Sequence, residues 1–346
     1  GRINFSDLIS FETQYKREDS DFHRLQERLG TGNSTETLTF KTYLYADKFL
    51  PSIWGVSLPF TFNYSTTNST PKYFPYQPDV LTGGLENAPD EIKSLNKTVS
   101  LSSSFNKSAR GKSWFVRNTF DRINLNYAII NKVNSSVTVK SDESINKDMG
   151  LSYNYNFSKE NYFKPFKEES LFNRVFSSIP IVKNIVKPIL NKIEDTKIYY
   201  TPEKITANMG ISDDYQLKIM RLGLDATETT NINMNRTLNI TQRIFDNFQS
   251  NYKLVIGSDI YREMDENNLS RLDLLSDLNP GVIENLSQTF TNTYIPEVFF
   301  WFKPTIRFNP SYTWTLGNPT NETQVSTIKN TTNFETKFDI SPNEII

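Results

Sequence analysis

Apolar and polar residues alternate one by one along much of this chain of 346 residues. In GVSLPFTFNYS, residues 55–65, apolar side chains stand at almost every second position from Val56 to Tyr64, mostly with Ser, Thr or Asn between them. Successive side chains of a β-strand point to opposite faces, so this period of two predicts a strand with one apolar and one polar face. Pro59 has no amide hydrogen for a neighbouring strand, so we expect a bulge or a locally unpaired position there.

The same alternation predicts strands elsewhere in the chain. It runs through residues 9–16, 38–45, 99–105, 123–129, 149–157, 205–211 and 305–316. These runs are about 7–11 residues long, the length that a tilted strand needs to cross the hydrocarbon of a membrane. Aromatic residues lie near several strand ends, at Tyr15, Tyr64, Phe157 and Trp314. Outer-membrane barrels carry aromatic girdles at such positions.

The polar face decides between two all-β architectures. Its Ser, Thr, Asn, Lys and Glu side chains would need hydrogen-bond partners in the dry core of a soluble sandwich. A water-filled channel accommodates them without partners. The sequence therefore favours an all-β fold of antiparallel transmembrane strands, with a soluble β-sandwich as the alternative.

One segment breaks the period of two. Within residues 170–195, apolar residues recur at spacings of three and four, which predicts a helical insertion; they are Val175, Ile179, Val182, Val186, Ile189 and Ile193. Two interpretations stay open: a helical hairpin at the membrane interface, or a loop helix packed on its own neighbours.

Composition narrows the function classes. The formal net charge is −1, so no strongly basic surface points to nucleic acid. The chain has no cysteine, which excludes disulfides and cysteine metal sites. Hydrophobic residues make up 37% of the chain and aromatic residues 13%, a balance that suits a sheet with one apolar and one wet face. The start Gly-Arg-Ile-Asn leads us to expect an excised piece of a longer protein.

Little in the sequence suggests bond chemistry. His23 is the only histidine, so a site with two histidine ligands is excluded and a triad would depend on that one residue. The carboxylates near Asp259 and Glu263 show no pairing pattern and are interpreted as solvated loop charges, with a calcium site as a minor alternative. We therefore predict no catalytic, metal-binding or cofactor-binding residue and no enzyme.

The segment SIWGVSLPFTFNYSTTNSTPKYFPYQPDV resembles a signature of the SprA/Sov family. In that family a Trp-Gly strand runs into a Leu/Ile-Pro pair and then into a PKY-x-P-x-x-PD turn. The residues that match this pattern are Trp54, Gly55, Leu58, Pro59, Pro71, Lys72, Tyr73, Pro75, Pro78 and Asp79. Weaker similarities follow in the same order at SDFHRLQERLG, KIYYTPEKITANMGIS and LSQTFTNTYIPEVFFWFKPTIRFNPSYTWTLGN.

The resemblance implies a giant outer-membrane β-barrel, the translocon of the type IX secretion system in Bacteroidota and related Gram-negative bacteria, linked to gliding motility in some relatives. Residues 1–346 would form one partial barrel segment, an interior arc of about 10–14 strands. The partners that it implies are outer-membrane lipids, the rest of the same barrel chain, a PorV-like barrel protein that captures cargo, a periplasmic plug protein and secreted cargo with C-terminal sorting domains. No nucleic acid is implied.

On this interpretation each strand face has a role. The structural rim turn would comprise Pro71, Lys72, Tyr73, Pro75, Pro78 and Asp79. The lipid-facing candidates are Val56, Leu58, Phe60, Phe62, Tyr64, Ile306, Phe308, Tyr312 and Trp314. The lumen-facing candidates are Ser57, Thr61, Asn63, Thr305, Arg307, Asn309, Ser311 and Thr313.

Three rival functions stay open at this stage. A different outer-membrane transporter barrel, of the TonB-dependent or lipopolysaccharide-insertion type, shares the strand pattern. An extracellular β-sandwich adhesin would be soluble without detergent. A barrel lipase would depend on His23.

Overall fold

The computed structural model describes residues 1–5, 7–21, 32–165, 196–223, 225–267, 280–296, 302–317 and 326–340. Antiparallel β-strands dominate, with 69% strand and 9% helix, which confirms the predicted all-β antiparallel class. The predicted helical insertion at residues 170–195 and His23 lie outside the described residues.

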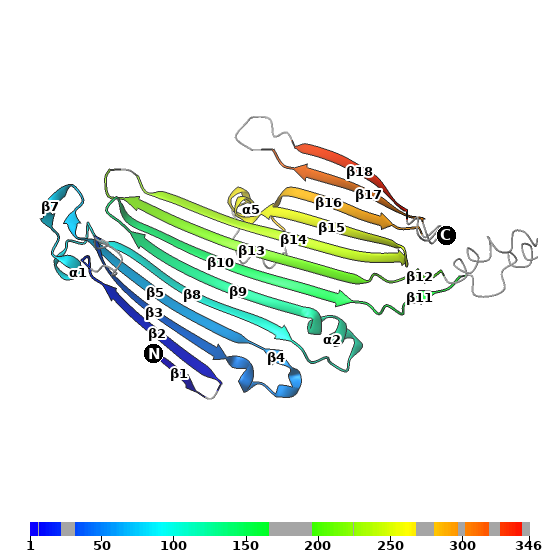
Figure 1. Ribbon diagram of the computed structural model, residues 1–346, viewed down its shortest axis with the longest axis horizontal. Helices are drawn as coiled ribbons and strands as arrows, with labels where there is room; N and C mark the ends of the chain where they lie inside the picture. Colours follow the sequence, from blue (N-terminus) through cyan, green and yellow to red (C-terminus); the bar gives the residue numbers. More distant parts are fainter. Residues whose placement is uncertain are drawn as a thin grey trace, which may run out of the picture. The chain divides into compact units, whose positions relative to one another are not determined.

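Thirteen strands follow one another in hydrogen-bonded order, and a short extra strand joins the same sheet (Figure 1). The order is β1 (Arg2–Phe5), β2 (Ile9–Glu18), β3 (Asn33–Tyr45), β5 (Pro59–Pro71), β8 (Ser94–Lys107), β9 (Ile123–Ser135), β10 (Val139–Asn156), β13 (Lys204–Met220), β14 (Thr227–Phe245), β15 (Phe248–Asp259), β16 (Val282–Tyr294), β17 (Phe302–Thr315) and β18 (Thr327–Ile340). The extra strand β4 (Val56–Ser57) pairs with β8. Two small ribbons stand apart from this order: β6 (Tyr73–Phe74) with β7 (Gln77–Leu81), and β11 (Tyr162–Phe163) with β12 (Ile198–Tyr199).

Short helices occupy several connections. They are η1 (Ala46–Phe49), η2 (Ser52–Trp54), α1 (Gly84–Asn87), α2 (Trp114–Asn118), η3 (Phe120–Arg122) and α5 (Ile260–Asn267). No helix in the described part of the chain is long and apolar enough to cross a membrane.

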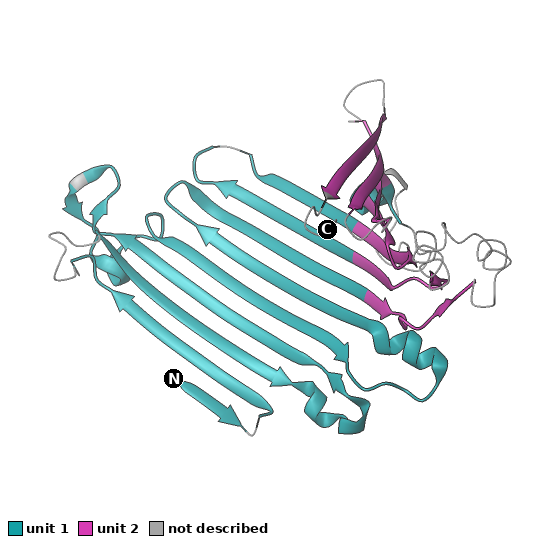
Figure 2. Ribbon diagram, turned by 45° about the vertical axis from the view of Figure 1, so that its right-hand side comes forward, with its two compact units in different colours: residues 1–152, 210–234, 259–282 teal, residues 153–209, 235–258, 283–346 magenta. Residues whose placement is uncertain are grey.

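The chain divides into two compact units (Figure 2). Unit 1 comprises residues 1–152, 210–234 and 259–282, and unit 2 comprises residues 153–209, 235–258 and 283–346. Strands β1 to β9 lie wholly in unit 1, and strands β16 to β18 lie almost wholly in unit 2.

The strand predicted at residues 56–65 is interrupted beside its proline. Val56 lies opposite Lys107 of β8, and Phe60 lies opposite Ser103, so both strands advance four residues between these pairs. Leu58 and Pro59 take no part in the pairing with β8. The prediction of a locally unpaired position is therefore confirmed on the β8 side, whereas Pro59 pairs with Tyr45 of β3 on the other side. The register does not shift, so the alternation of faces continues from Val56 into β5.

Few apolar side chains are buried. Within the described ranges the buried hydrophobic residues are Ala88, Ile92, Ile232 and Ile260. The last two form a small cluster in unit 1 with Ile211, Met234 and Met264, where helix α5 packs on the sheet. A soluble sandwich packs its two sheets face to face over apolar side chains from both inner faces, and a core of that kind is missing from the described residues.

Candidate functional surfaces

The strand register of unit 1 collects the apolar side chains on one face. Residues that are directly opposite in antiparallel strands point to the same face. Phe62 of β5 lies opposite Thr42 of β3 and Leu101 of β8, and Leu101 lies opposite Ile129 of β9. The neighbouring row runs through Phe40, Tyr64, Val99 and Asn131. We call this surface the apolar face of unit 1.

A chain of phenylalanine rings crosses four strands on this face. The ring centroids of Phe5 and Phe11 are 6.4 Å apart, those of Phe11 and Phe40 are 6.1 Å apart, and those of Phe40 and Phe62 are 6.4 Å apart. These distances fall in the range of favourable aromatic pairs. The ring contacts stabilise the pairing of neighbouring strands. They lie on the surface of the sheet, since no second layer of described residues buries them.

Unit 2 carries a second apolar face on β16, β17 and β18. Trp314 lies opposite Leu286 on one side and Ile328 on the other. Phe308 lies opposite Phe334, and both side chains are exposed. Ile306, Phe308, Tyr312 and Trp314, the lipid-facing candidates of β17, therefore share one face.

The opposite face of unit 1 is lined by hydroxyl and amide groups. The hydroxyls of Thr37 and Thr67 are 3.1 Å apart, and those of Thr35 and Ser69 are 3.4 Å apart. Thr61 lies opposite Tyr43 and Ser102 on the same face. Asn63 also points to this face, and its Oδ1 is buried without a hydrogen-bond partner in the structure. A buried amide oxygen of this kind is usually satisfied by water.

The polar face of unit 2 also carries hydroxyl and amide groups, together with more charged side chains. Arg307 lies opposite Glu335, and its guanidinium approaches that carboxylate at 3.3 Å. Asn309 lies opposite Asn333, and Thr313 lies opposite Lys329. The five lumen-facing candidates of β17 therefore share one face, whereas Ser57 lies in the separate short strand β4. Which of the two faces meets lipid stays a prediction.

The strands are longer than the alternating runs in the sequence. Strand β10 has 18 residues, β13 has 17 and β14 has 19, whereas about 9–11 tilted residues cross a hydrocarbon layer. In unit 1 the surplus of β10 and β13 is polar on both faces. Lys147 Nζ is 3.0 Å from Asp213 Oδ2 on one face, and the adjacent Asn146 donates to Asp214 on the other at 2.5 Å.

The apolar band has a measurable height. On β9 it runs from Ile123 to Val133, which is about 33 Å along the strand. A strand tilted by about 40°, as in outer-membrane barrels, would give this band a height of about 25 Å. An apolar band about 25 Å tall is typical of outer-membrane barrels. Beyond this band the same face carries Glu36 and Asn68, which lie opposite one another.

The predicted rim turn is a small ribbon braced by hydrogen bonds. Strand β5 ends at Pro71, and β6 and β7 then form a hairpin that begins at Tyr73. Thr82, which is buried, closes the hairpin: its hydroxyl donates to the carbonyl oxygen of Pro71 at 2.6 Å, and its amide donates to that of Lys72 at 3.0 Å. Pro75 lies at the tip of the turn.

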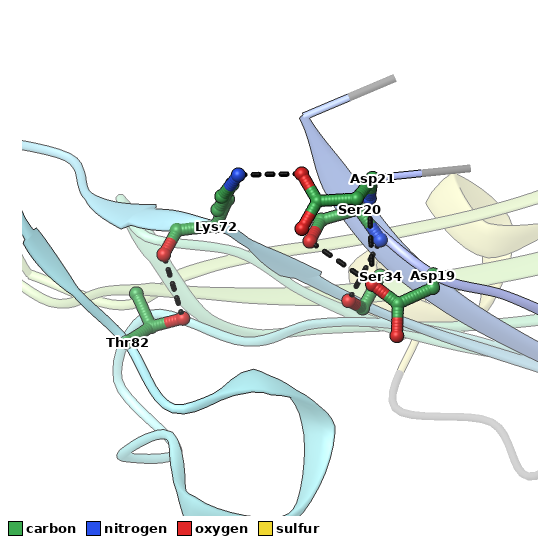
Figure 3. A network of polar contacts seen from close by, with 6 residues as sticks. All are labelled: Asp19, Ser20, Asp21, Ser34, Lys72 and Thr82. Atoms are coloured by element: carbon green, nitrogen blue, oxygen red, sulfur yellow. Dashed lines mark hydrogen bonds and ion pairs between the residues drawn. The ribbon is translucent and has the colours of Figure 1, made fainter. Parts of the chain in front are cut away.

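Polar contacts tie this turn to the connection between β2 and β3 (Figure 3). The Lys72 ammonium is 2.5 Å from Asp21 Oδ1, and the Ser20 amide donates to Ser34 Oγ at 3.2 Å. The bond to Asp21 raises the pKa of Lys72 above its ordinary value. Thr70, with no exposed surface, lies opposite Ser34 beneath this network. The proline-rich segment is therefore an ordered structure rather than a simple strand end.

A buried ion pair at the opposite strand ends escaped the sequence analysis. Asp121 of η3 has a fully buried side chain, accepts a hydrogen bond from the Gly111 amide and forms an ion pair with Lys107 at the end of β8. Burial disfavours the charged carboxylate, but the bonds from Lys107 and Gly111 outweigh it and lower the pKa of Asp121 below its ordinary value. The ion pair fixes residues 108–122 to the end of β8.

In unit 2 the ribbon β11–β12 is attached to the end of β14. Tyr199 donates its hydroxyl hydrogen to Asp246 at 2.6 Å, and the amide group of Gln242 donates to the carbonyl oxygens of Tyr199 and Thr201 at 3.2 Å. Burial and the Asp246 carboxylate raise the pKa of Tyr199 above its ordinary value. Arg243 lies over the Tyr199 ring, with its Cζ 5.7 Å from the centroid.

The described residues contain no cluster of three or more His, Asp or Glu side chains arranged to hold a metal ion. Their distinctive features are structural: long antiparallel strands, an apolar and a polar face in each unit, and a β6–β7 hairpin closed by hydrogen bonds from Thr82. These features define the class as a strand-rich sheet protein with an apolar and a polar face in each unit.

The comparisons with known proteins narrow this class. Residues 2–83 match the SprA_N family model, described as "Motility related/secretion protein". This match supports membership of the SprA/Sov family, as predicted from the sequence. The matched region contains β1 to β7 and the whole rim turn. No curated protein matches the chain.

Solved structures add only a distant likeness. Four chains match, among them the translocator domain of autotransporter NalP from Neisseria meningitidis. It is 8% identical, the alignment covers 94% of this chain and 85% of that one, and the TM-score is 0.21.

Proposed function

We propose that this chain forms part of the wall of the outer-membrane protein-conducting channel of the type IX secretion system. The apolar faces contact lipid, and the polar faces line a water-filled conduit for folded cargo. The channel works through its width, its wetness and its gating, and it carries out no bond chemistry.

One observation carries this proposal: the strand register separates apolar from polar side chains row by row from β2 to β9. A large exposed apolar surface is unfavourable in water, and the described residues include no second sheet that covers it. Lipid removes this cost, because hydrocarbon solvates Phe62 and Leu101 directly. The family match over residues 2–83 supports secretion as the setting.

The polar face suits a conduit for folded proteins. Hydroxyl and amide groups such as those of Thr61 and Asn63 hydrogen-bond to water and hold no net charge, so they offer few strong sites that would retain cargo. The ion pair of Arg307 with Glu335 neutralises itself in the same way. A wide barrel with a polar interior stays hydrated.

The proposed assembly has several partners. Other strands of the same barrel chain would complete the wall, and a PorV-like barrel protein would capture cargo through its C-terminal sorting domain. A periplasmic plug protein would close the channel. The proposed location is the outer membrane of Bacteroidota or related Gram-negative bacteria.

Depletion of the full-length protein in its host tests the function. We expect proteins with C-terminal sorting domains to disappear from the medium and to accumulate in the periplasm, as measured by quantitative proteomics. Re-expression of the wild-type gene is the control. An unchanged secretome with impaired uptake of a nutrient would contradict the proposal and favour an ordinary transporter barrel.

Cysteine labelling tests the assignment of the faces, since residues 1–346 contain no cysteine. Thr61→Cys and Phe62→Cys place thiols at adjacent positions on opposite faces of β5. In intact outer membranes we expect a water-soluble maleimide to modify Thr61→Cys but not Phe62→Cys. Equal reaction at both positions would contradict a lipid-facing apolar face.

A further inference from the structure

Two loop segments at one end of the unit 1 strands expose large apolar side chains. Lobe 1, residues 46–55, contains η1 and η2 and connects β3 to β4. Lobe 2, residues 108–122, contains α2 and η3 and connects β8 to β9. Figure 2 shows both lobes at the same end of unit 1.

Three of these side chains are more exposed than any large apolar side chain of the described strands. Ile53 is 82% exposed, Phe49 is 72% exposed and Trp114 is 71% exposed. Phe115 and Phe120 form an edge-to-face pair, with ring centroids 6.1 Å apart, that is also exposed. Apolar residues at this density are uncommon on loops that contact only water.

Lobe 2 also carries an excess of positive charge, and lobe 1 adds Lys48 beside Asp47. Lys48, Arg110, Lys112 and Arg117 are exposed and form no ion pair with any residue that the structure describes. The acids of the lobes, Asp47 and Asp121, contact residues just outside the lobes, and the Asp47 carboxylate keeps its negative charge beside Lys48. Asp121 pairs with Lys107, and Asp47 accepts a hydrogen bond from the Leu58 amide at 3.1 Å.

The lobes are held in place rather than loosely attached. Gly55 has φ +58°, and its carbonyl oxygen accepts hydrogen bonds from the Ser108 amide at 2.8 Å and from the Ser108 hydroxyl at 3.0 Å. A side chain at residue 55 would collide with the backbone of Ala109. This contact joins the end of lobe 1 to the start of lobe 2, and Asp121 fixes the other end of lobe 2.

We propose that the two lobes form an interfacial anchor that binds the anionic lipid headgroups of the leaflet at this end of the strands. Tryptophan with exposed Lys and Arg is the composition that places a segment in the headgroup layer. The lobes continue the apolar face, because Val56 follows lobe 1 directly and Ile123 follows lobe 2. This inference rests on the proposed membrane-spanning role of the sheet.

The positive charge of the lobes favours anionic lipid over a protein as the partner that contacts them. Arg110, Lys112 and Arg117 of lobe 2, which form no ion pair with a described residue, match a continuous anionic surface. Each Lys or Arg near such a surface strengthens association about fivefold. Aromatic side chains from both lobes would enter the boundary between headgroups and acyl chains, while the cations remain at the phosphates.

Spin labelling of the full-length protein in nanodiscs tests the anchor. Nitroxide labels would be attached at Ile53→Cys and Trp114→Cys, with Leu101→Cys on the apolar face and Ser102→Cys on the polar face as controls. Accessibility to oxygen and to a water-soluble nickel complex reports depth. We expect the two lobe labels at the level of the lipid phosphates and the Leu101 label in the hydrocarbon.

Each result has one interpretation. If the Leu101 label lies in hydrocarbon but the lobe labels are as accessible to nickel as the Ser102 label, the anchor is refuted and the membrane-spanning role stands. Lobe labels shielded from both reagents would indicate a protein partner, which also refutes the anchor. A Leu101 label in water would refute the proposed function itself.

Changing the lipid composition tests whether the cations of the lobes bind anionic headgroups. We expect the lobe labels to lie deeper in nanodiscs that contain about one-third phosphatidylglycerol than in phosphatidylcholine alone, because the cations attract the anionic headgroups. The combined variant K48Q, R110Q, K112Q and R117Q should lose this difference. The control variant K16Q with K132Q, changed on the polar face, should keep it. A difference that survives in the fourfold variant would overturn the proposed headgroup binding.

Discussion

An arginine placed on either face of one strand tests the division of the sheet most directly. Leu101 and Ser102 are adjacent in β8, and both are exposed. Leu101 lies between Phe62 and Ile129 on the apolar face, whereas Ser102 lies between Thr61 and Ala128 on the polar face. Leu101→Arg and Ser102→Arg therefore add the same charge at the same height on opposite faces.

The row of Leu101 lies near the middle of the apolar band, since Ile129 is the fourth of six positions from Ile123 to Val133 on that face. Arginine at the midplane of a lipid-facing strand costs about 2–4 kcal/mol. We expect Leu101→Arg to lower the free energy of unfolding by about 3 kcal/mol, which is more than a hundredfold in the folding equilibrium constant. Ser102→Arg, solvated by the conduit, should change it by less than about 0.5 kcal/mol.

The assay is guanidinium unfolding of the full-length protein in phospholipid vesicles, followed by tryptophan fluorescence. The amount of each variant in the outer membrane of the host provides an independent measure. Equal losses for the two variants would show that both faces meet similar surroundings. A larger loss for Ser102→Arg would reverse the assignment of the faces.

Three further substitutions test the connections. Gly55→Ala should destabilise the joint between the lobes by more than about 2 kcal/mol, because the new side chain clashes with the backbone and residue 55 has a left-handed conformation. The control Gly84→Ala, at φ +77° in open space, should cost only about 1 kcal/mol, and equal costs of the two variants in unfolding experiments would contradict the clash. Asp121→Asn should cost about 1.5–3 kcal/mol. Because the folded pKa of Asp121 is lowered, its contribution to stability is complete above about pH 5 and is lost as the pH falls through the folded value. Proteolysis in lobe 2 should therefore rise in acid for the wild type, and a wild-type acid response in Asp121→Asn would refute this origin. In the predicted rim turn, Thr82→Val should increase amide exchange of the β6–β7 hairpin more than Lys72→Gln does. The reason is that Thr82 is buried, whereas the ion pair of Lys72 is exposed; a larger effect of Lys72→Gln would contradict this account.

Clean alternation was enough to predict eight strands, and the failures have physical causes. Strand β14 escaped because Arg236 and Gln242 interrupt the apolar positions of its register. Strand β18 escaped because Asn330, Thr332 and Thr336 share a face with its aromatic residues. Both strands are specified by their neighbours in the sheet more than by their own pattern.

The predicted strand lengths were too short for a related reason. Alternation reports only the part of a strand whose two faces meet different surroundings. Where Lys147 pairs with Asp213 on one face and Asn146 with Asp214 on the other, both faces are polar and the period disappears. The backbone ladder nevertheless continues, because strand pairing needs no apolar face.

Some features of the candidate surfaces could be predicted from the sequence and others could not. The faces of β5 and β17 follow from parity alone, so the sequence predicted which residues share a face. The buried pair of Lys107 and Asp121 depends on how the 13 residues between them close back on the strand, and no local pattern records that closure. The bracing of the rim by Thr82 depends in the same way on a hairpin whose register shifts between Tyr73 and Phe74.

The lengths and the polarities of the strands lead to one conclusion about stability. A soluble domain stabilises its sheet by burying one face against another layer, but here only four apolar side chains of the described residues are buried. The backbone ladder and cross-strand rings such as those of Phe11 and Phe40 hold neighbouring strands together. The remaining stabilisation has to come from the surroundings of the apolar face. The sheet should therefore depend on lipid or detergent to stay folded, and the polar extensions beyond the apolar band should be the part that keeps its structure in water.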